Sequence, residues 1–379
     1  MKRVLAALFG IGMLGAAPVH PYRSSDGWRL AGEDGIRGIT IGPIENAYHQ
    51  GVGYGSPAYA RTLDECVHMG ATWVAITPFG RVGDLTGRGV DPTFEKPFTE
   101  NRADVMRGIE MAHARGLRVM LVPHLWVEST EWRAKIDPGS DAGWDAWTKS
   151  YGSFVEGWAH VAESSHVELF SAGVELRSWV TTPRAPTFAA LVRRLRGIYK
   201  GPITYSGNWD DIEHTLILPE LDVIGINAFF PLADKNGAPF EKLLEGGQRV
   251  REKVHALAAT WQRPVLFTEI GYTTRPDPAV RPWEWPESMK NVMVDERAQA
   301  EAYRALIAPL LDEPSFMGFF VWRVYADPDD VSQEPEFGFS PRGKESELVV
   351  RDAFAARWAA DVNRPPGWGR KARIAGLFP

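Results

Sequence analysis

The feature that most constrains the fold is a regular alternation of short apolar segments with longer amphipathic segments, which continues through most of the 379 residues. The apolar segments have the length of strands, and they lack the apolar–polar alternation of strands with one face in water, so they predict strands buried on both faces. Eight such segments occur: 38–42, 72–77, 117–123, 167–175, 202–205, 221–227, 264–269 and 317–322.

Between these segments, apolar residues recur at helical spacing. Ser56 followed by Pro57 is typical of a helix start, and Gly116 is typical of a helix end. The expected helices cover residues 56–69, 101–115, 144–164, 187–199, 243–260, 295–311 and 348–361, with a weaker, short helix over 211–220. Eight strands that alternate with helices favour a single-domain α/β fold, a (β/α)8 TIM barrel over residues 36–361, rather than a doubly wound sheet. The glycines of segment 51–55 lack the spacing of a dinucleotide-binding loop.

The N-terminus has the pattern of an export signal. Lys2 and Arg3 precede an apolar segment that ends in small residues near Ala17, which predicts a secretory signal peptide over residues 1–17 and export to a periplasm or to the medium. A first buried helix or strand is the alternative. No segment approaches the roughly 20 apolar residues that a membrane span needs. The Pro-, Gly- and Arg-rich residues 362–379 are expected to form a C-terminal tail.

Composition excludes several classes of protein. The net charge of −6 gives no basic surface for nucleic acid. The single cysteine, Cys66, excludes an internal disulfide and a cysteine-built metal site. Among nine histidines only His124 stands at the end of an expected strand, so we expect no metal and no cofactor. The 15 tryptophans exceed what a core of this size needs, and a carbohydrate is the partner that would use them.

Two glutamates stand where a barrel places catalytic groups. Active sites of (β/α)8 barrels lie at the carboxyl ends of the strands, and Glu175 and Glu269 end the fourth and seventh apolar segments. Buried carboxylates cost several kcal/mol without partners. One explanation for the two glutamates is purely structural, namely a salt bridge to Arg177, Arg323 or another rim arginine. Hydrolysis of a glycoside with retention is the functional one, because it needs two carboxyl groups about 5–5.5 Å apart.

Aromatic residues near these strand ends are candidate sugar platforms, since a flat ring packs on the apolar face of a sugar. Trp179 and Trp209 are the best placed, whereas Trp158 is expected in the core. Trp322 and His124 end strands and fit either the core or the site. The loop of residues 274–289, which contains Trp283 and Trp285, is expected either to wall a sugar subsite or simply to pack on the surface.

The strand-end motifs resemble a known group of enzymes. The segments Gly-Val-Glu at 173–175, Thr-Glu-Ile-Gly-Tyr at 268–272 and Val-Trp at 321–322 resemble the retaining (β/α)8 glycoside hydrolases of clan A. The segments Tyr-Ser-Gly-Asn-Trp at 205–209 and Gly-Ile-Asn-Ala-Phe-Phe-Pro-Leu at 225–232 are most similar to glycoside hydrolase family 113, known for endo-β-1,4-mannanase activity.

The resemblance covers roughly residues 36–361 and implies roles for individual residues. Glu175 would be the general acid/base, Glu269 the nucleophile and Trp322 the aromatic floor of the −1 subsite. The substrate-binding residues would be His124, Trp126, Trp179, Asn208, Trp209, Asn227 and Tyr272, the substrate a β-linked hexose polymer or oligosaccharide, and β-1,4-mannan the preferred one. This division of labour requires a raised pKa for Glu175 and an ionised Glu269.

One residue departs from the clan's pattern. Much of the clan has asparagine before the acid/base, where it binds the sugar 2-hydroxyl, whereas this chain has Val174. Asn208 or His124 could supply that bond. Val174 also motivates the alternative of a non-catalytic carbohydrate-binding or cell-envelope protein on the same barrel. A metal-dependent hydrolase and a Gly-x-Ser-x-Gly serine hydrolase lack their motifs.

Overall fold

The structure, a computed structural model, describes residues 35–42, 51–93, 96–285, 289–329 and 336–358. The predicted signal peptide, residues 1–17, and the predicted tail, residues 362–379, lie outside the described residues. None of the helices in these ranges is long and apolar enough to cross a bilayer.

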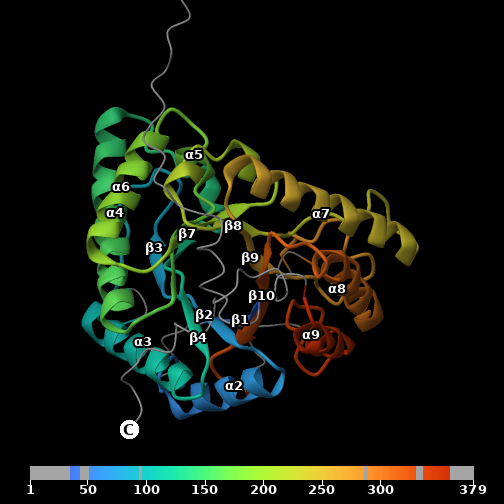
Figure 1. Cartoon of the computed structure of the whole chain (residues 1–379). Coiled ribbons are helices and arrows are strands. Elements are labelled where there is room, and N and C mark those ends of the chain that lie inside the picture. The colour runs from blue at the N-terminus through green and yellow to red at the C-terminus, as the bar shows by residue number, and fades with distance from the viewer. Residues whose placement is uncertain (1–34, 43–50, 94–95, 286–288, 330–335, 359–379) are drawn as a thin grey trace, which may run out of the picture.

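Eight parallel strands close into a barrel, which confirms the predicted fold (Figure 1). Their order around the barrel is β1-β10-β9-β8-β7-β6-β4-β2. The strands are β1 (Ile36–Gly42), β2 (Trp73–Ile76), β4 (Arg118–Leu121), β6 (Leu169–Val174), β7 (Ile203–Asn208), β8 (Ile224–Asn227), β9 (Val265–Ile270) and β10 (Phe316–Tyr325). Each overlaps one of the eight apolar segments, because strands buried on both faces have no polar face to interrupt the run of apolar residues.

Helices surround the barrel and follow the expected alternation (Figure 1). Ser56 caps the first by accepting a hydrogen bond from the Tyr59 backbone N–H at 3.1 Å, and Pro57 begins it. The longer helices are α2 (Pro57–His68), α3 (Phe98–His113), α4 (Asp141–Ser164), α6 (Ala185–Ile198), α7 (Phe240–Trp261), α8 (Glu296–Leu310) and α9 (Glu345–Ala355). The weak helix expected over residues 211–220 is instead two 3-10 turns, Ile212–His214 and Leu218–Glu220.

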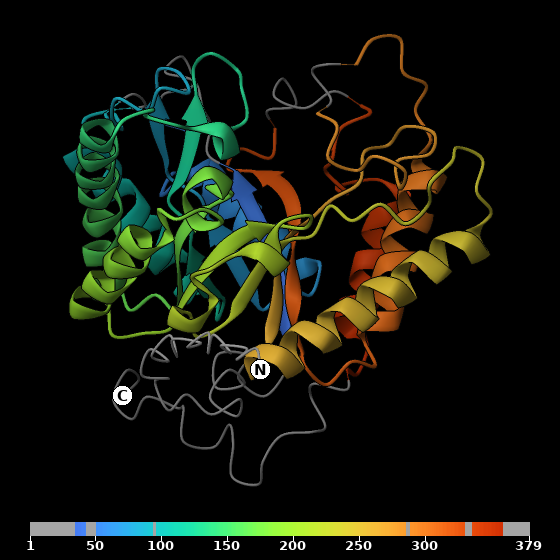
Figure 2. The same cartoon turned by 90° about the horizontal axis from the view of Figure 1, so that it is seen from above.

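A second, two-stranded sheet was not predicted. Strands β3 (Phe79–Val82) and β5 (His124–Val127) pair in parallel, with Phe79 opposite His124. Each follows a barrel strand after a short break that contains Pro78 or Pro123. Proline lacks the N–H that a continuous ladder needs, so β2 and β4 end there and the chain continues as a separate pair. In Figure 2 this pair stands on one side of the barrel's upper end, and the loop between β9 and α8 stands on the other.

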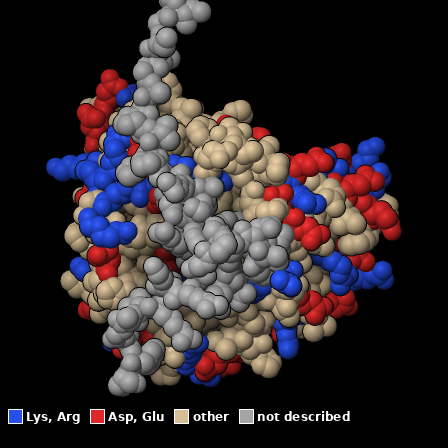
Figure 3. All heavy atoms as spheres, in the orientation of Figure 1, with Lys and Arg blue, Asp and Glu red and all other residues tan. Residues whose placement is uncertain are grey.

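The outer helices carry charges that are largely paired. On the face shown in Figure 3, basic residues gather over the side of α4 and α6, while both signs mix over α7 and α8. Arginines of α6 pair with acidic residues of neighbouring elements, as in Arg194 with Glu156 at 3.0 Å and Arg196 with Asp222 at 2.8 Å. Such a surface balances its charge locally.

The α4–α6 side of the barrel buries an aromatic cluster that contains Trp179. This residue lies in the short helix α5 (Arg177–Val180) and is 1% exposed. Its ring packs edge-on against Phe188, at 5.0 Å between centroids, and its Nε1–H donates to the Thr187 hydroxyl at 2.7 Å. Further ring contacts come from Trp144, Trp147 and Tyr151. The prediction that Trp179 is a sugar platform is therefore wrong, and Trp158, expected in the core, is fully buried.

Because Trp179 is a core residue, Trp179→Ala is expected to lower the free energy of unfolding by about 3–5 kcal/mol through the lost burial and the cavity. Urea unfolding would measure this loss. Trp283→Ala, the same substitution at a ring that is 45% exposed, is the matched control and should cost much less. A fully folded Trp179→Ala variant that keeps its stability but loses sugar affinity would contradict the assignment.

Candidate active site

Glu175 directly follows β6 and is held there by the neighbouring strand. Its backbone N–H donates to the carbonyl of Ser206 at 2.9 Å, and the next N–H, of Leu176, donates to the hydroxyl of Tyr205 at 2.6 Å. The backbone of Glu175 has φ +51°, in the left-handed region. For a residue with a Cβ this conformation costs about 1–3 kcal/mol, and such residues cluster at functional sites.

The carboxylate of Glu175 is buried and accepts three hydrogen bonds. Oε2 accepts from Trp132 Nε1 at 2.7 Å and from Arg133 Nη1 at 3.2 Å. Oε1 accepts from Asn227 Nδ2 at 3.0 Å. The rim arginine that pairs with this glutamate is Arg133. Arg177, the nearest candidate in sequence, pairs with Asp210 and Asp211 instead.

Glu269 lies in β9, in register with Asn227 of β8, and is also buried. Burial, and next the charge of Glu175, raise the pKa of Glu269 well above its ordinary value. The guanidinium groups of Arg133 and Arg323 and a hydrogen bond from the Asn227 side chain act in the opposite direction. The charge of one carboxyl group thus acts on the other, and Asn227, which donates to Glu175, lies opposite Glu269 on the neighbouring strand.

The direction of the pKa shift at Glu269 differs from the one expected for a nucleophile. The sequence predicts that Glu175 keeps the proton and that Glu269 is ionised. Burial raises the pKa of Glu269, which opposes the ionised form that a nucleophile needs, and three hydrogen-bond donors face the carboxylate of Glu175.

His124 joins the same network as a neutral imidazole. Burial, and next the charge of Arg133, lower the pKa of His124 well below its ordinary value. Its Nδ1–H donates to the carbonyl of Leu125 at 3.2 Å, so Nε2 is left to accept a hydrogen bond from Arg133 Nη2 at 3.2 Å. The same Nε2 lies 3.9 Å from Glu269 Oε1. Arg133 therefore connects His124 to Glu175.

Aromatic rings form one side of the site. Trp322 in β10 packs with Phe229 and Phe339, and Trp209 packs against this cluster. The ring of His124 is 6.3 Å from Trp322 between centroids, and the guanidinium of Arg323 lies 4.8 Å from the Trp322 ring. The indole Nε1–H of Trp322 is buried without a hydrogen-bond partner in the described part of the chain.

Of the remaining predicted residues, Asn208 and Trp126 stay candidates for sugar binding, whereas Tyr272 does not. Asn208 ends β7, is buried and donates to Asp210 Oδ1 at 2.6 Å. Trp126 lies on β5, with the guanidinium of Arg81 5.6 Å from its ring centroid. Tyr272 does not join the site, because it is 0% exposed and packs edge-on against Tyr303 of α8. The prediction that Tyr272 binds substrate is therefore wrong, because its side chain, like that of Trp179, is buried in the core.

Sequence reasoning missed Trp132 and Arg133, the two residues that donate to Oε2 of Glu175. They lie at the 3-10 turn Arg133–Lys135, several residues beyond the end of β5. They are not at a strand end, so the rule that active-site residues lie at strand ends does not identify them. The available signal was the Trp-Arg pair itself, since an indole N–H beside a guanidinium is a donor pair suited to a carboxylate.

Val174 lies among the apolar side chains that fill the barrel interior. It therefore offers no polar atom to a sugar. No group of three or more His, Cys, Asp or Glu side chains suited to a metal ion occurs within the described ranges.

A closed parallel barrel with two interacting buried glutamates, a neutral histidine and aromatic rings at the strand ends defines a barrel glycosidase. The sequence matches the family model of Glycoside Hydrolase Family 113 over residues 47–339, and the chain belongs to this family. A search of curated protein sequences gives no match.

Solved structures agree with this assignment. The chain is 25% identical to the GH113 β-mannanase AaManA from Alicyclobacillus acidocaldarius, solved in complex with ManMIm, with a TM-score of 0.72 over 84% of this chain and 97% of that one. A GH113 β-1,4-mannanase complex gives 20% identity and a TM-score of 0.71, over 85% and 99% of the two chains. A Glycoside Hydrolase Family 5 mannosidase from Rhizomucor miehei shares the fold, with 11% identity, a TM-score of 0.58 and coverage of 86% and 95%.

The raised pKa of Glu269 gives a prediction about stability. Below the pKa of a glutamate in the unfolded chain, both states hold the proton and burial costs nothing extra. Above it, the unfolded chain releases the proton more readily than the folded one, so the contribution of Glu269 to stability falls as pH rises towards its folded-state pKa. Glu269→Gln should therefore be more stable than the wild type at pH 8, and the difference should shrink towards pH 4.

Thermal unfolding at several pH values would measure this difference. Glu175→Gln is the matched control, and it should be less stable than the wild type because Arg133 then lacks its buried carboxylate partner. A Glu269→Gln variant that is less stable than the wild type at pH 8 would show that the site favours an ionised Glu269.

Proposed function

We propose that this enzyme hydrolyses β-1,4-linked mannan or manno-oligosaccharides with retention of configuration. The observation that carries the mechanism is that Glu175 and Glu269 are buried at the ends of β6 and β9, that the charge of Glu175 acts on Glu269, and that Asn227 donates to Glu175 and lies in register with Glu269. A glutamate whose pKa is raised by burial and by the charge of a second glutamate lies near that second glutamate, as the two carboxyl groups of a retaining enzyme do at about 5–5.5 Å. The β-mannanase titles of the structural relatives support the choice of substrate.

In the first step, a carboxylate oxygen of Glu269 attacks the anomeric carbon while Glu175 gives its proton to the departing glycosidic oxygen. A covalent glycosyl ester on Glu269 and a free sugar hydroxyl result. In the second step, Glu175 takes a proton from water, whose oxygen displaces Glu269 from the anomeric carbon. Both carboxyl groups then return to their starting states.

Substrate binding has to overcome the raised pKa of Glu269, because this carboxyl group attacks in its ionised form. Positive charge develops at the anomeric carbon beside Glu269 in the transition state, and this charge favours the ionised form of that carboxyl. The charges of Arg133 and Arg323 act in the same direction. Glu175 then holds the proton that the leaving oxygen needs.

Several residues are suited to hold the sugar at these carboxyl groups. Trp322 would form the floor, since its ring belongs to the aromatic cluster and its Nε1–H has no other partner in the described part of the chain. Asn208 or His124 would supply the hydrogen bond to the 2-hydroxyl that Val174 cannot make. Trp126 and Trp209 would contact neighbouring sugar units.

The role of each glutamate can be tested by substitution. Glu175→Ala and Glu269→Ala should each lower turnover on β-mannan at least about 10³-fold, because each removes a group that acts in the transition state, while folding and sugar binding persist. Leu348→Ala, at an exposed position on α9, is the control. Near-wild-type turnover in either glutamate variant would overturn the assignment.

A mechanism-based inhibitor separates the two roles in the same experiment. A 2-deoxy-2-fluoro-β-mannoside should form a stable adduct on Glu269, which peptide mass spectrometry would locate. An adduct on Glu175 would reverse the two roles. No adduct and no hydrolysis of any β-glycoside would favour the non-catalytic carbohydrate-binding protein.

We also propose that the enzyme is exported to a periplasm or to the medium. The basic residues Lys2 and Arg3 and the apolar segment 4–17 support this location. Expression with the native N-terminus should yield exported protein that begins near residue 18, as N-terminal sequencing would determine. Exported protein that retains Met1 would contradict a cleaved signal.

A further inference from the structure

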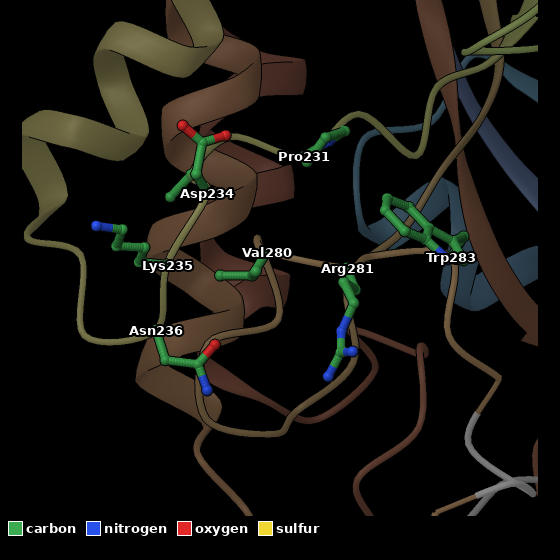
Figure 4. A pocket seen from close by; sticks show the side chains of 8 residues that line it. Pro231, Asp234, Lys235, Asn236, Val280, Arg281 and Trp283 are labelled. Carbon is green, nitrogen blue, oxygen red and sulfur yellow. The ribbon is translucent and has the colours of Figure 1, made fainter.

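The polar side chains at the rim of the barrel include two groups besides the two glutamates. One group lines a pocket of about 610 Å³ between the loops after β8 and β9 (Figure 4). The other consists of Arg177, Asp210 and Asp211, which follow the carboxyl ends of β6 and β7, and we call it the Arg177 cluster. The Arg177 cluster contacts Trp132, which donates to the carboxylate of Glu175. Direct contacts therefore lead from this cluster to the proposed acid/base.

Two carboxylates hold the guanidinium of Arg177 in one orientation. Its Nε–H donates to Asp211 Oδ2 at 2.6 Å, and its Nη2–H donates to Asp210 Oδ1. Asp211 is only 5% exposed, and its backbone N–H donates to the carbonyl of Asn208 at 3.2 Å, so this partner is itself fixed to the end of β7. Because a guanidinium is planar and its donors form a rigid fork, bonds to two separate carboxylates determine the plane of the group.

The guanidinium of Arg177, held in this way, lies over the indole ring of Trp132. The distance from Cζ to the ring centroid is 4.7 Å, within the range at which a cation is attracted to an aromatic face. Trp132 is half-buried and belongs to the loop after β5, where no strand ladder fixes its backbone. The contact with Arg177 restricts the tilt of the ring and, with it, the direction of the indole N–H.

The direction of this N–H matters for the proton that Glu175 gives. Trp132 Nε1–H donates to Glu175 Oε2 at 2.7 Å and so helps to fix the plane of the carboxyl group. A general acid transfers its proton efficiently only when it lies within hydrogen-bond reach of the leaving oxygen. A carboxyl group that turns away from that oxygen loses this part of the rate.

We propose that Arg177 is a positioning residue, which acts through Trp132 to hold the general acid/base Glu175 in place for proton transfer. The inference rests on the proposed hydrolysis of a β-linked glycan and extends it to a residue outside the pair of glutamates. Loss of Arg177 should therefore weaken the donation of a proton to the leaving group, while the attack by Glu269 continues as before.

The test compares two leaving groups that differ in their need for a proton. Mannotetraose releases a sugar hydroxyl, which needs a proton, whereas the 2,4-dinitrophenyl β-glycoside of mannobiose releases a stable anion, which needs none. The measured quantity is kcat/KM, which covers only the steps up to the covalent ester. In Arg177→Met it should fall about tenfold for mannotetraose, as expected for the loss of a partly desolvated cation–π contact, and less than about twofold for the aryl glycoside. Arg177→Lys keeps the charge without the planar fork, and should show a smaller loss with the same difference between substrates.

A double-mutant cycle tests whether the effect passes through Trp132. Trp132→Phe keeps an aromatic ring beneath the guanidinium but removes the indole N–H, so it should also impair mannotetraose more than the aryl glycoside. Once that N–H is absent, Arg177 has nothing left to position. The added substitution Arg177→Met should therefore lower kcat/KM for mannotetraose by no more than about twofold beyond Trp132→Phe alone.

The chain offers a matched control in Arg184. This residue also pairs with an aspartate, Asp141, at 2.6 Å, and also lies over a tryptophan, Trp144, with 5.7 Å to the ring centroid. The indole N–H of Trp144 donates to Asp137, at 3.1 Å, and not to a catalytic glutamate. Arg184→Met should therefore leave kcat/KM unchanged for both substrates.

Equal losses on both substrates in Arg177→Met would assign the residue to folding or to sugar binding and overturn the proposal, as would additive losses in the cycle. If Arg177→Met does not fold, Arg177→Lys replaces it in both measurements, and the same outcomes decide. Failure of the wild type to cleave any β-mannan would refute the proposed substrate instead, and the same comparison with the glycan that it does cleave would then decide the role of Arg177. Failure to cleave any glycoside would overturn both proposals.

Discussion

The site depends on one electrostatic constraint, namely that two carboxyl groups buried in a small space cannot both be charged without compensation. Glu175 receives an indole N–H, a guanidinium and an amide, whereas Glu269 retains a raised pKa. Arg133 also donates to His124, which stays neutral and adds no further charge. The neighbouring side chains thus compensate the two carboxyl groups unequally, with three donors at Glu175 and a raised pKa at Glu269.

The barrel supplies the geometry that this constraint needs. Glu175, Asn208, Asn227 and Glu269 come from the ends of four consecutive strands, β6 to β9. The two glutamates are therefore separated by two strands, and Asn227 of one of these donates to Glu175 and lies in register with Glu269. His124 reaches the same place from outside the barrel sheet. The chain breaks at Pro123 after β4, and His124 begins the separate strand β5.

The sequence predicts the barrel well because parallel strands buried on both faces appear as unbroken apolar segments. It also identifies both glutamates, since a carboxylate at the end of such a segment has no simple structural explanation. The side sheet of β3 and β5 escapes prediction because its strands continue after a break of only two residues, and Trp132 and Arg133 escape because they lie deep in a loop. Trp179 and Tyr272 were wrongly predicted to bind substrate, because closeness in sequence to a glutamate does not determine which way a side chain points. Trp179 lies in a helical turn that faces the core, and Tyr272 faces α8.

The backbone of Glu175 shows that the demands of folding and of chemistry oppose each other at this position. With φ +51°, glycine would occupy the position without steric cost, and a residue with a Cβ raises the free energy of the folded state. The hydrogen bonds from the backbone of residues 175 and 176 to β7 keep the chain in this conformation. Main-chain geometry therefore fixes the direction of the Cα–Cβ bond, and the three donors to the carboxylate hold the rest of the side chain, so the group is positioned in advance of the substrate and little conformational entropy remains to be lost when the glycan arrives.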